Sequence, residues 1–146
     1  MENSTLLNAL NSLLSNYQIY YQNLRGFHWN VTGFNFFGLH EKFEELYLES
    51  AENVDEIAER ILAIGGKPLH TFEDYLETAS IKSAKNITDG KDTVAYVLEN
   101  SQILLRQLKS ILNTASELND EGTVSLISDL ISNTEKRIWM LKAFLR

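Results

Sequence analysis

Residues 6–31 read LLNALNSLLSNYQIYYQNLRGFHWNV, and their apolar side chains recur at spacings that alternate strictly between four and three. An α-helix completes a turn in about 3.6 residues, so this spacing predicts a helix with one continuous apolar face. A face of this length has to be covered by other elements, which favours a helical bundle. The face comprises Leu6, Leu10, Leu13, Tyr17, Tyr20, Leu24, Phe27 and Val31.

Three further segments carry helical periodicity, at residues 36–64, 91–115 and 124–145. The second segment ends at Gly65-Gly66, a common helix stop, with Pro68 just beyond it. Thr88 or Asp89 is a suitable N-cap for the third segment, and Asn119 or Asp120 for the fourth. No strand-like alternation competes with these patterns, so the sequence predicts an all-α protein.

The lengths of the connections predict the topology. The first and second helices are joined by a few residues, as are the third and fourth, so each pair is expected to be antiparallel. About 23 residues (66–88) separate the second helix from the third and contain a possible short helix at 72–79. One long crossover is typical of a ferritin-like four-helix bundle, here expected as a single domain over residues 1–146.

The composition narrows the possible functions. A net charge of −7 argues against a general nucleic-acid binder, because phosphate contacts need clustered Lys and Arg. The chain has no cysteine, which excludes disulfides and thiol catalysis. No apolar run reaches the roughly 20 residues of a membrane span, and no positive charge precedes Arg25, as a secretory signal would require. We therefore expect a cytoplasmic protein that does not bind membranes.

Two pairs of polar residues in the second helix have the spacing of metal ligands. His40 and Glu44 are four residues apart, as are Asp55 and Glu59, so each pair projects from one helix face. The 11 residues from Glu44 to Asp55 leave a rotational offset of only about 20° but a rise of about 16 Å. The two pairs thus share a face, yet one metal cannot reach both.

Two interpretations remain open for these pairs. They are ordinary solvated side chains, or a second copy of the helix lies antiparallel across a two-fold axis near Glu49 and Ser50. In the second case, His40 and Glu44 of one copy face Asp55 and Glu59 of the other, and symmetry creates the site twice.

His28 supports the second interpretation. It lies near the end of the first helix, so the short hairpin is expected to bring it to His40, with Arg25 available to pair with a carboxylate there. Two imidazoles and three carboxylates without sulfur suit Fe(II), Mn(II) or Zn(II).

A resemblance to a known family rests on these same residues. Residues 27–66, FHWNVTGFNFFGLHEKFEELYLESAENVDEIAERILAIGG, closely resemble the signature of the Dps family of miniferritins. The likeness extends to KPLHTFEDYLE in the crossover and EKRIWMLKAFL in the last helix. Other ferritins use Glu-x-x-His motifs inside one bundle, and this sequence has none.

The resemblance implies a shell of twelve subunits that oxidises Fe(II), preferentially with hydrogen peroxide, and stores the ferric mineral. It implies iron centres at two-fold interfaces, of which a di-iron centre is one form. One subunit is expected to supply His28, His40 and Glu44 as ligands, and its partner Asp55 and Glu59. Many family members carry aspartate where this chain has Glu44; this is a departure from the pattern, and it leaves open whether Glu44 binds the metal directly or through water.

The resemblance also bears on iron uptake and on DNA. Asp120, Glu121 and Asp129 lie at the start of the fourth helix, where miniferritins form acidic pores, although acidic residues also complement a helix dipole there. The family binds DNA through a flexible Lys-rich tail that this sequence lacks, so we expect weak or no DNA binding. The alternative function is a helical-bundle interaction or DNA-compaction protein without significant ferroxidase activity.

Overall fold

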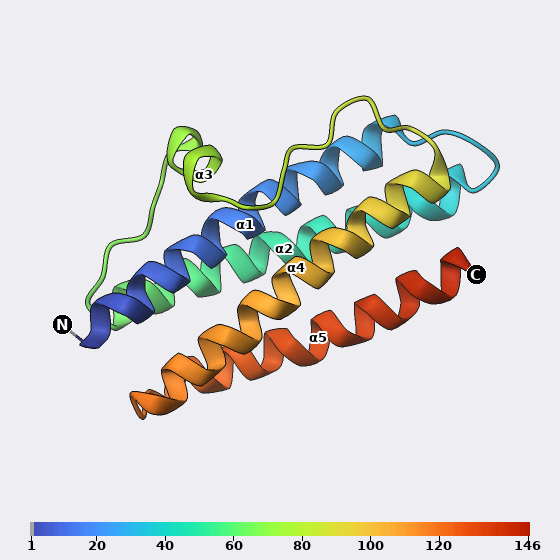
Figure 1. Cartoon of the computed structure of the whole chain (residues 1–146). Helices are drawn as coiled ribbons and strands as arrows, with labels where there is room; N and C mark the ends of the chain where they lie inside the picture. The colour runs from blue at the N-terminus through green and yellow to red at the C-terminus, as the bar shows by residue number, and fades with distance from the viewer. Residues whose placement is uncertain (1) are drawn as a thin grey trace.

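The computed structural model describes residues 2–146 and contains five helices (Figure 1). The four long helices and the short helix predicted from the sequence are all present. Apart from one isolated bridge between Thr32 and Asp89, the described residues form no β-structure. The helices are α1 (Glu2–Asn30), α2 (Phe36–Ala63), α3 (Phe72–Thr78), α4 (Gly90–Glu117) and α5 (Glu121–Leu145).

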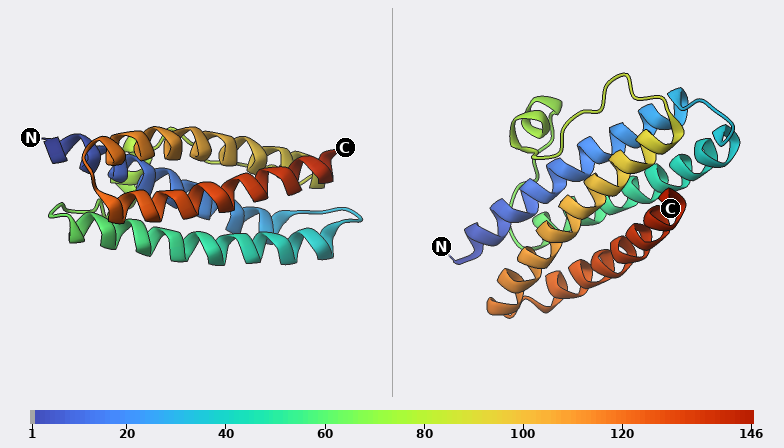
Figure 2. Two further views of the ribbon diagram at one scale, coloured as in Figure 1. Left: turned by 90° about the horizontal axis from the view of Figure 1, so that it is seen from below. Right: turned by 45° about the vertical axis from the view of Figure 1, so that its right-hand side comes forward.

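The helices form two antiparallel hairpins, α1 with α2 and α4 with α5, joined by a crossover that runs back along α1 (Figures 1 and 2). The crossover carries α3, which packs against α1, and it ends where Thr32 in the α1–α2 turn donates to the Thr88 carbonyl at 2.9 Å. The expected all-α, ferritin-like arrangement with one long crossover is therefore confirmed. None of the described helices is long and apolar enough to cross a membrane.

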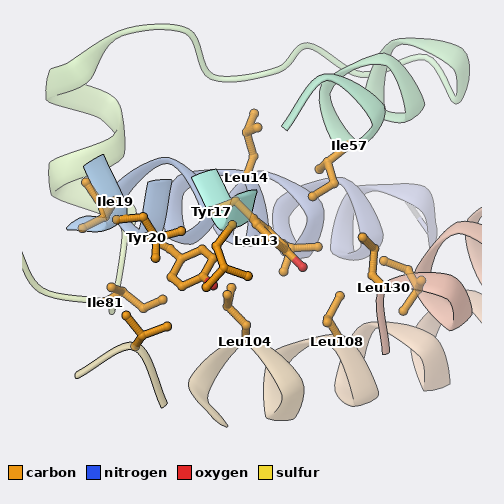
Figure 3. Close-up of a cluster of buried hydrophobic side chains, with 14 of the residues drawn as sticks. Leu13, Leu14, Tyr17, Ile19, Tyr20, Ile57, Ile81, Leu104, Leu108 and Leu130 are labelled. Carbon is orange, nitrogen blue, oxygen red and sulfur yellow. The ribbon is translucent and has the colours of Figure 1, made fainter. Parts of the chain in front are cut away.

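The apolar face of α1 forms the centre of the core. All eight residues predicted for this face are buried, none more than 3% exposed. Figure 3 shows how side chains from the other long helices and the crossover close over α1, with Ile57, Leu104, Leu130 and Ile81 among them. Burial of this kind contributes about 1.5–3 kcal/mol for each large apolar side chain, so the hairpins are held together chiefly along this line.

Buried asparagines of α1 hold the crossover in place. The Asn16 side chain accepts from the backbone N–H groups of Ser80 and Ile81, at 2.8 and 2.9 Å, and donates to Gln107 on α4 at 2.8 Å. Irregular backbone packed against a bundle needs such partners, because unpaired buried N–H groups are costly. Asn23 does the same further along, with bonds to Lys82, Ala84 and Asn100.

The end of α2 is fastened to the start of α5 through one arginine. The Arg60 guanidinium donates to Asp120 at 2.7 Å and to the Thr123 hydroxyl at 2.9 Å. It lies so close over Gly122 that a β-carbon there would come within 2.5 Å of it. Asp120 also caps α5 by accepting from the Thr123 backbone N–H at 3.1 Å.

The Asp120 carboxyl is correspondingly acidic. Partial burial on its own raises the pKa of Asp120, but the hydrogen bonds from Thr123 and the charge of Arg60 outweigh burial and hold that pKa below its usual value. A depressed pKa means that the folded state favours the carboxylate, so this group stabilises the fold wherever it is ionised.

Replacing this carboxylate gives a stability prediction with a defined pH dependence. Asp120→Asn is expected to lower the free energy of unfolding at pH 7 by about 1–2 kcal/mol, because the ion pair with Arg60 is lost. The wild-type advantage is complete above the ordinary aspartate pKa of about 4 and is lost as the pH falls through the lower folded pKa. Urea unfolding at several pH values measures the difference. The exposed Asp129→Asn is the control, and a difference that stays constant into acid would contradict the assignment.

Candidate metal centre

His28 and His40 come together at the end of the bundle where α1 turns into α2. His28 lies two residues before the end of α1, and His40 lies one turn inside α2. Their imidazole rings stack with centroids 3.8 Å apart and planes within 11° of parallel. His28 is buried and His40 is half-buried. The hairpin therefore pairs the two histidines as their positions in the sequence predict.

Two reciprocal hydrogen bonds determine which ring nitrogens are free. Nδ1 of His28 lies 2.6 Å from the backbone carbonyl of His40, and Nδ1 of His40 lies 2.7 Å from the carbonyl of His28. A carbonyl oxygen can only accept, so each Nδ1 carries the hydrogen and donates it. In each neutral ring, Nε2 then keeps its lone pair, which is the form in which histidine binds metals.

Glu44 lies beside the free nitrogen of His28. One of its carboxylate oxygens is 3.6 Å from Nε2 of His28, and about half of the Glu44 side chain is exposed (51%). A cation between this nitrogen and this oxygen would contact both. Within one chain, His28 therefore has Glu44 beside its free nitrogen and His40 stacked on its ring.

Asp55 and Glu59 are not part of this cluster. Both are exposed on α2, about four and five turns further along the helix from His40. Within residues 2–146, no group of three or more His, Asp or Glu side chains is close enough to hold a metal ion. One copy of the chain therefore brings together only part of the predicted ligand set.

The centre of the bundle has the wrong chemistry for a metal site. In di-iron bundles the inward-facing ligands are Glu and His. Here α5 inserts the buried Arg137, which donates to Ser101 at 3.0 Å, lies 5.2 Å from the Tyr20 ring centroid and is 3.7 Å from Glu49. Burial also raises the pKa of Tyr17 to about 12, only partly offset by the charge of Arg137, so this phenol stays neutral. A guanidinium repels cations, and neutral phenols carry no charge to attract them.

The sequence did not reveal the rings that surround the histidines. Phe36 stacks on His40 with centroids 5.0 Å apart, and Tyr47 meets His28 edge-on at 5.4 Å. The spacing of four between Phe36 and His40 is a signal that indicates such a contact on a helix. Arg25 forms no ion pair with any carboxylate of residues 2–146, contrary to expectation, and its guanidinium lies over the Tyr21 and Trp29 rings, at 5.4 and 5.0 Å.

The three acidic residues suggested for a pore differ in their surroundings. Asp120 is engaged by Arg60 and by the N-terminus of α5, whereas Glu121 and Asp129 are exposed. Only the last two carry carboxylates directed at solvent without a salt bridge among the described residues.

Comparison with known proteins identifies the structural class to which this helical bundle belongs. The Ferritin-like domain family matches residues 7–146. A solved structure from Vibrio cholerae O1, described as a Dps protein and a member of a broad superfamily of ferritin-like diiron-carboxylate proteins, is 46% identical. It superposes with a TM-score of 0.98 over 99% of this chain and 91% of that one. The fold is therefore that of the ferritin-like proteins.

Sequence relatives narrow the class to one family. DNA protection during starvation protein 2 of Bacillus anthracis is 43% identical over 98% of this chain and 98% of its own length. A Dps structure from Listeria innocua soaked with zinc is 33% identical, with a TM-score of 0.93 over 96% of this chain and 95% of that one. The chain belongs to the Dps family of ferritin-like proteins.

Proposed function

We propose that this protein is a ferroxidase and iron-storage miniferritin that assembles as a dodecameric shell and protects against oxidative stress. The observation that carries the proposal is the His28–His40 pair, in which both Nδ1 atoms donate to backbone and both Nε2 atoms are left to bind iron. Family membership supports iron storage, and a diiron-carboxylate relative supports the ligand chemistry. The proposed compartment is the cytoplasm, and the lack of cysteine fits a reducing environment.

The proposed site is completed by a second copy of the chain. Asp55 and Glu59 share a helix face with His40 and Glu44, but the rise of about 16 Å between the pairs prevents them from meeting in one chain. An antiparallel α2 from a partner across a two-fold axis would bring the two halves together twice. In this arrangement His28 with the partner's Asp55 and the partner's Glu59 binds one Fe(II), and His40 with Glu44 holds a second, weaker one.

The proposed reaction uses Fe(II) and hydrogen peroxide as substrates. Each of two Fe(II) ions gives one electron, the O–O bond of the peroxide breaks, and two protons are taken up to form two water molecules. Because both electrons arrive together, no hydroxyl radical needs to be released. The ligand set of imidazole and carboxylate also suits Zn(II) and Mn(II), which would compete for the site.

Acidic side chains supply the proposed route for Fe(II) into the shell. We include Asp120, Glu121 and Asp129 at the start of α5 in this proposal. Exposed Glu121 and Asp129 are the stronger candidates, since the Asp120 carboxylate is already neutralised by Arg60. Replacing both exposed acids would be expected to slow iron uptake without changing the oxidation site.

We also propose that this protein binds DNA weakly or not at all at physiological salt, although relatives are named for DNA protection. A net charge of −7 opposes the release of counterions from DNA phosphates that drives such binding. Tight binding of duplex DNA with a steep dependence on salt would contradict this part of the proposal.

The ferroxidase proposal is tested by removing the exposed acids of α2. An Asp55→Ala, Glu59→Ala variant is expected to oxidise Fe(II) at least ~100-fold more slowly after anaerobic loading and addition of peroxide, because two charged ligands are lost. Ferric absorbance measures the rate. Glu52→Ala, Glu56→Ala is the matched control, since it removes the same number of exposed carboxylates from the same helix. Equal rates in all three proteins would favour the alternative, an interaction or DNA-compaction protein.

A further inference from the structure

Four aromatic rings form a continuous stack through the histidine pair. In order along the stack they are Phe36, His40, His28 and Tyr47, and we call them the aromatic column. Phe36 and His40 are 5.0 Å apart and nearly parallel at 20°, and the two imidazoles are 3.8 Å apart at 11°. Tyr47 closes the far end edge-on to His28 at 77° and is itself backed by Tyr21 at 6.0 Å.

Hydrogen bonds alone do not fix where each free nitrogen points. The bond from Nδ1 to a carbonyl restrains each imidazole, but a hydrogen bond tolerates a range of lengths and angles, so small rotations about the Cα–Cβ and Cβ–Cγ bonds can still move Nε2. A contact on the face of the ring removes this freedom. His40 has two ring neighbours that lie nearly parallel to it, Phe36 and His28, whereas His28 has His40 stacked on it and Tyr47 nearly perpendicular to it. A ligand atom has to be held within about 0.5 Å for a metal site to keep its affinity.

Phe36 is itself held firmly by the turn that begins α2. It is the first residue of the helix, and its backbone N–H donates to the Gly33 carbonyl at 3.1 Å. Gly33 has a φ of +109°, a conformation that glycine adopts without strain. The ring is half-buried and packs against the core, four residues before His40 on the same helix face. Hence Phe36 is placed by the backbone and not by the imidazole that it covers.

We propose that Phe36 and Tyr47 are positioning residues for the metal site, holding the two imidazoles so that their Nε2 atoms face the ligands of the second subunit. This inference rests on the proposed function, since it concerns the orientation of the same ligands. This positioning role requires neither a charge nor chemical reactivity in the side chains of Phe36 and Tyr47. An aromatic side chain of the same shape should serve at position 36, whereas an aliphatic one should not.

Metal affinity in the assembled protein tests the proposal directly. Phe36→Leu is expected to weaken Co(II) binding about tenfold, measured by titrating the visible absorbance of the bound ion, because loss of groups that orient metal ligands typically has an effect of this size. Fe(II) oxidation should show a raised KM with a smaller change in kcat. Phe36→Tyr is expected to restore wild-type values. Thermal unfolding and the mass of the assembly are measured for every variant.

Phe37→Leu is the matched control. Phe37 is the next residue, is 83% exposed, and packs against the Phe36 ring at 5.3 Å rather than against an imidazole. The Phe37→Leu variant is expected to bind Co(II) with the affinity of the wild type. If Phe36→Leu does not assemble, Tyr47→Leu replaces it, with Tyr47→Phe as the conservative variant and the same expectation.

The outcomes separate this inference from the proposed function. If wild-type protein binds no Co(II), or binds it equally well without Asp55 and Glu59, the metal site itself is wrong. If those acids matter but Phe36→Leu and Tyr47→Leu bind Co(II) normally, only the positioning role is overturned. An equal loss in Phe36→Leu and Phe37→Leu, or no rescue by Phe36→Tyr, would also overturn it.

Discussion

Two variants that are inactive alone are expected to recover about a quarter of the wild-type rate of Fe(II) oxidation when they are unfolded together in equal amounts and reassembled. One variant carries His28→Ala and His40→Ala, and the other carries Asp55→Ala and Glu59→Ala. Each proposed site takes its histidines from one subunit and its distal acids from the partner. With random pairing, half of the sites receive intact histidines, and half of those receive intact acids. The recovered rate is measured against reassembled wild-type protein.

A second mixture controls for nonspecific rescue. His28→Ala mixed with His40→Ala should regain no activity, because both changes fall in the half of the site that one subunit supplies. Native mass spectrometry establishes that mixed assemblies form. If mixed assemblies of the first pair remain inactive, the histidines and the distal acids do not meet across an interface, and the split-site proposal fails.

The sequence predicted the histidine pair for a reason specific to helical hairpins. A short turn forces the end of α1 beside the start of α2, so His28 and His40 had to be neighbours once the two helices were recognised. The reciprocal bonds to each other's carbonyl oxygens could not be predicted in the same way, because they depend on side-chain rotamers and on the exact helix separation. Those bonds are what leave both Nε2 atoms available.

Arg25 and Asp120 illustrate the limits of reading charge from sequence. Arg25 was expected to form an ion pair with a carboxylate. Its planar guanidinium instead lies over Tyr21 and Trp29, where it covers aromatic surface and remains partly exposed. Asp120 was predicted both as a helix cap and as part of an acidic pore. The cap is confirmed, and the contact with Arg60 that neutralises it joins residues 60 positions apart, which no local pattern reports.

The polar residues of α1 were the least predictable part of the fold. Asn16 and Asn23 lie beside an apolar stripe and are 2% and 5% exposed, although asparagine usually lies at the surface. Their partners are backbone groups of the crossover and side chains on α4, more than 50 residues away. Helical periodicity identifies which residues face inward, but it does not say what irregular chain will lie against them.

Removing the hydrogen bonds of Asn16 is expected to have a large effect on the stability of the fold. Asn16→Ala should lower the free energy of unfolding by about 3 kcal/mol, because the backbone N–H groups of Ser80 and Ile81 lose their acceptor and Gln107 loses its donor. Buried donors without a partner pay their full desolvation cost, so the effect should exceed that of an ordinary surface change. Urea unfolding followed by circular dichroism measures the difference.

Asn11→Ala is the appropriate control, since it removes an asparagine from the same helix that also bonds to the crossover. Asn11 is only half-buried, accepting from Leu69 N–H at 2.9 Å and donating to the Lys67 carbonyl at 3.1 Å. Water can replace its bonds, so a loss of about 1 kcal/mol or less is expected. Hydrogen exchange should then show the backbone amides of Ser80 and Ile81 exposed in Asn16→Ala and protected in Asn11→Ala. Equal losses of stability with both amides still protected would mean that the crossover is held by apolar packing around Ile81 and not by Asn16.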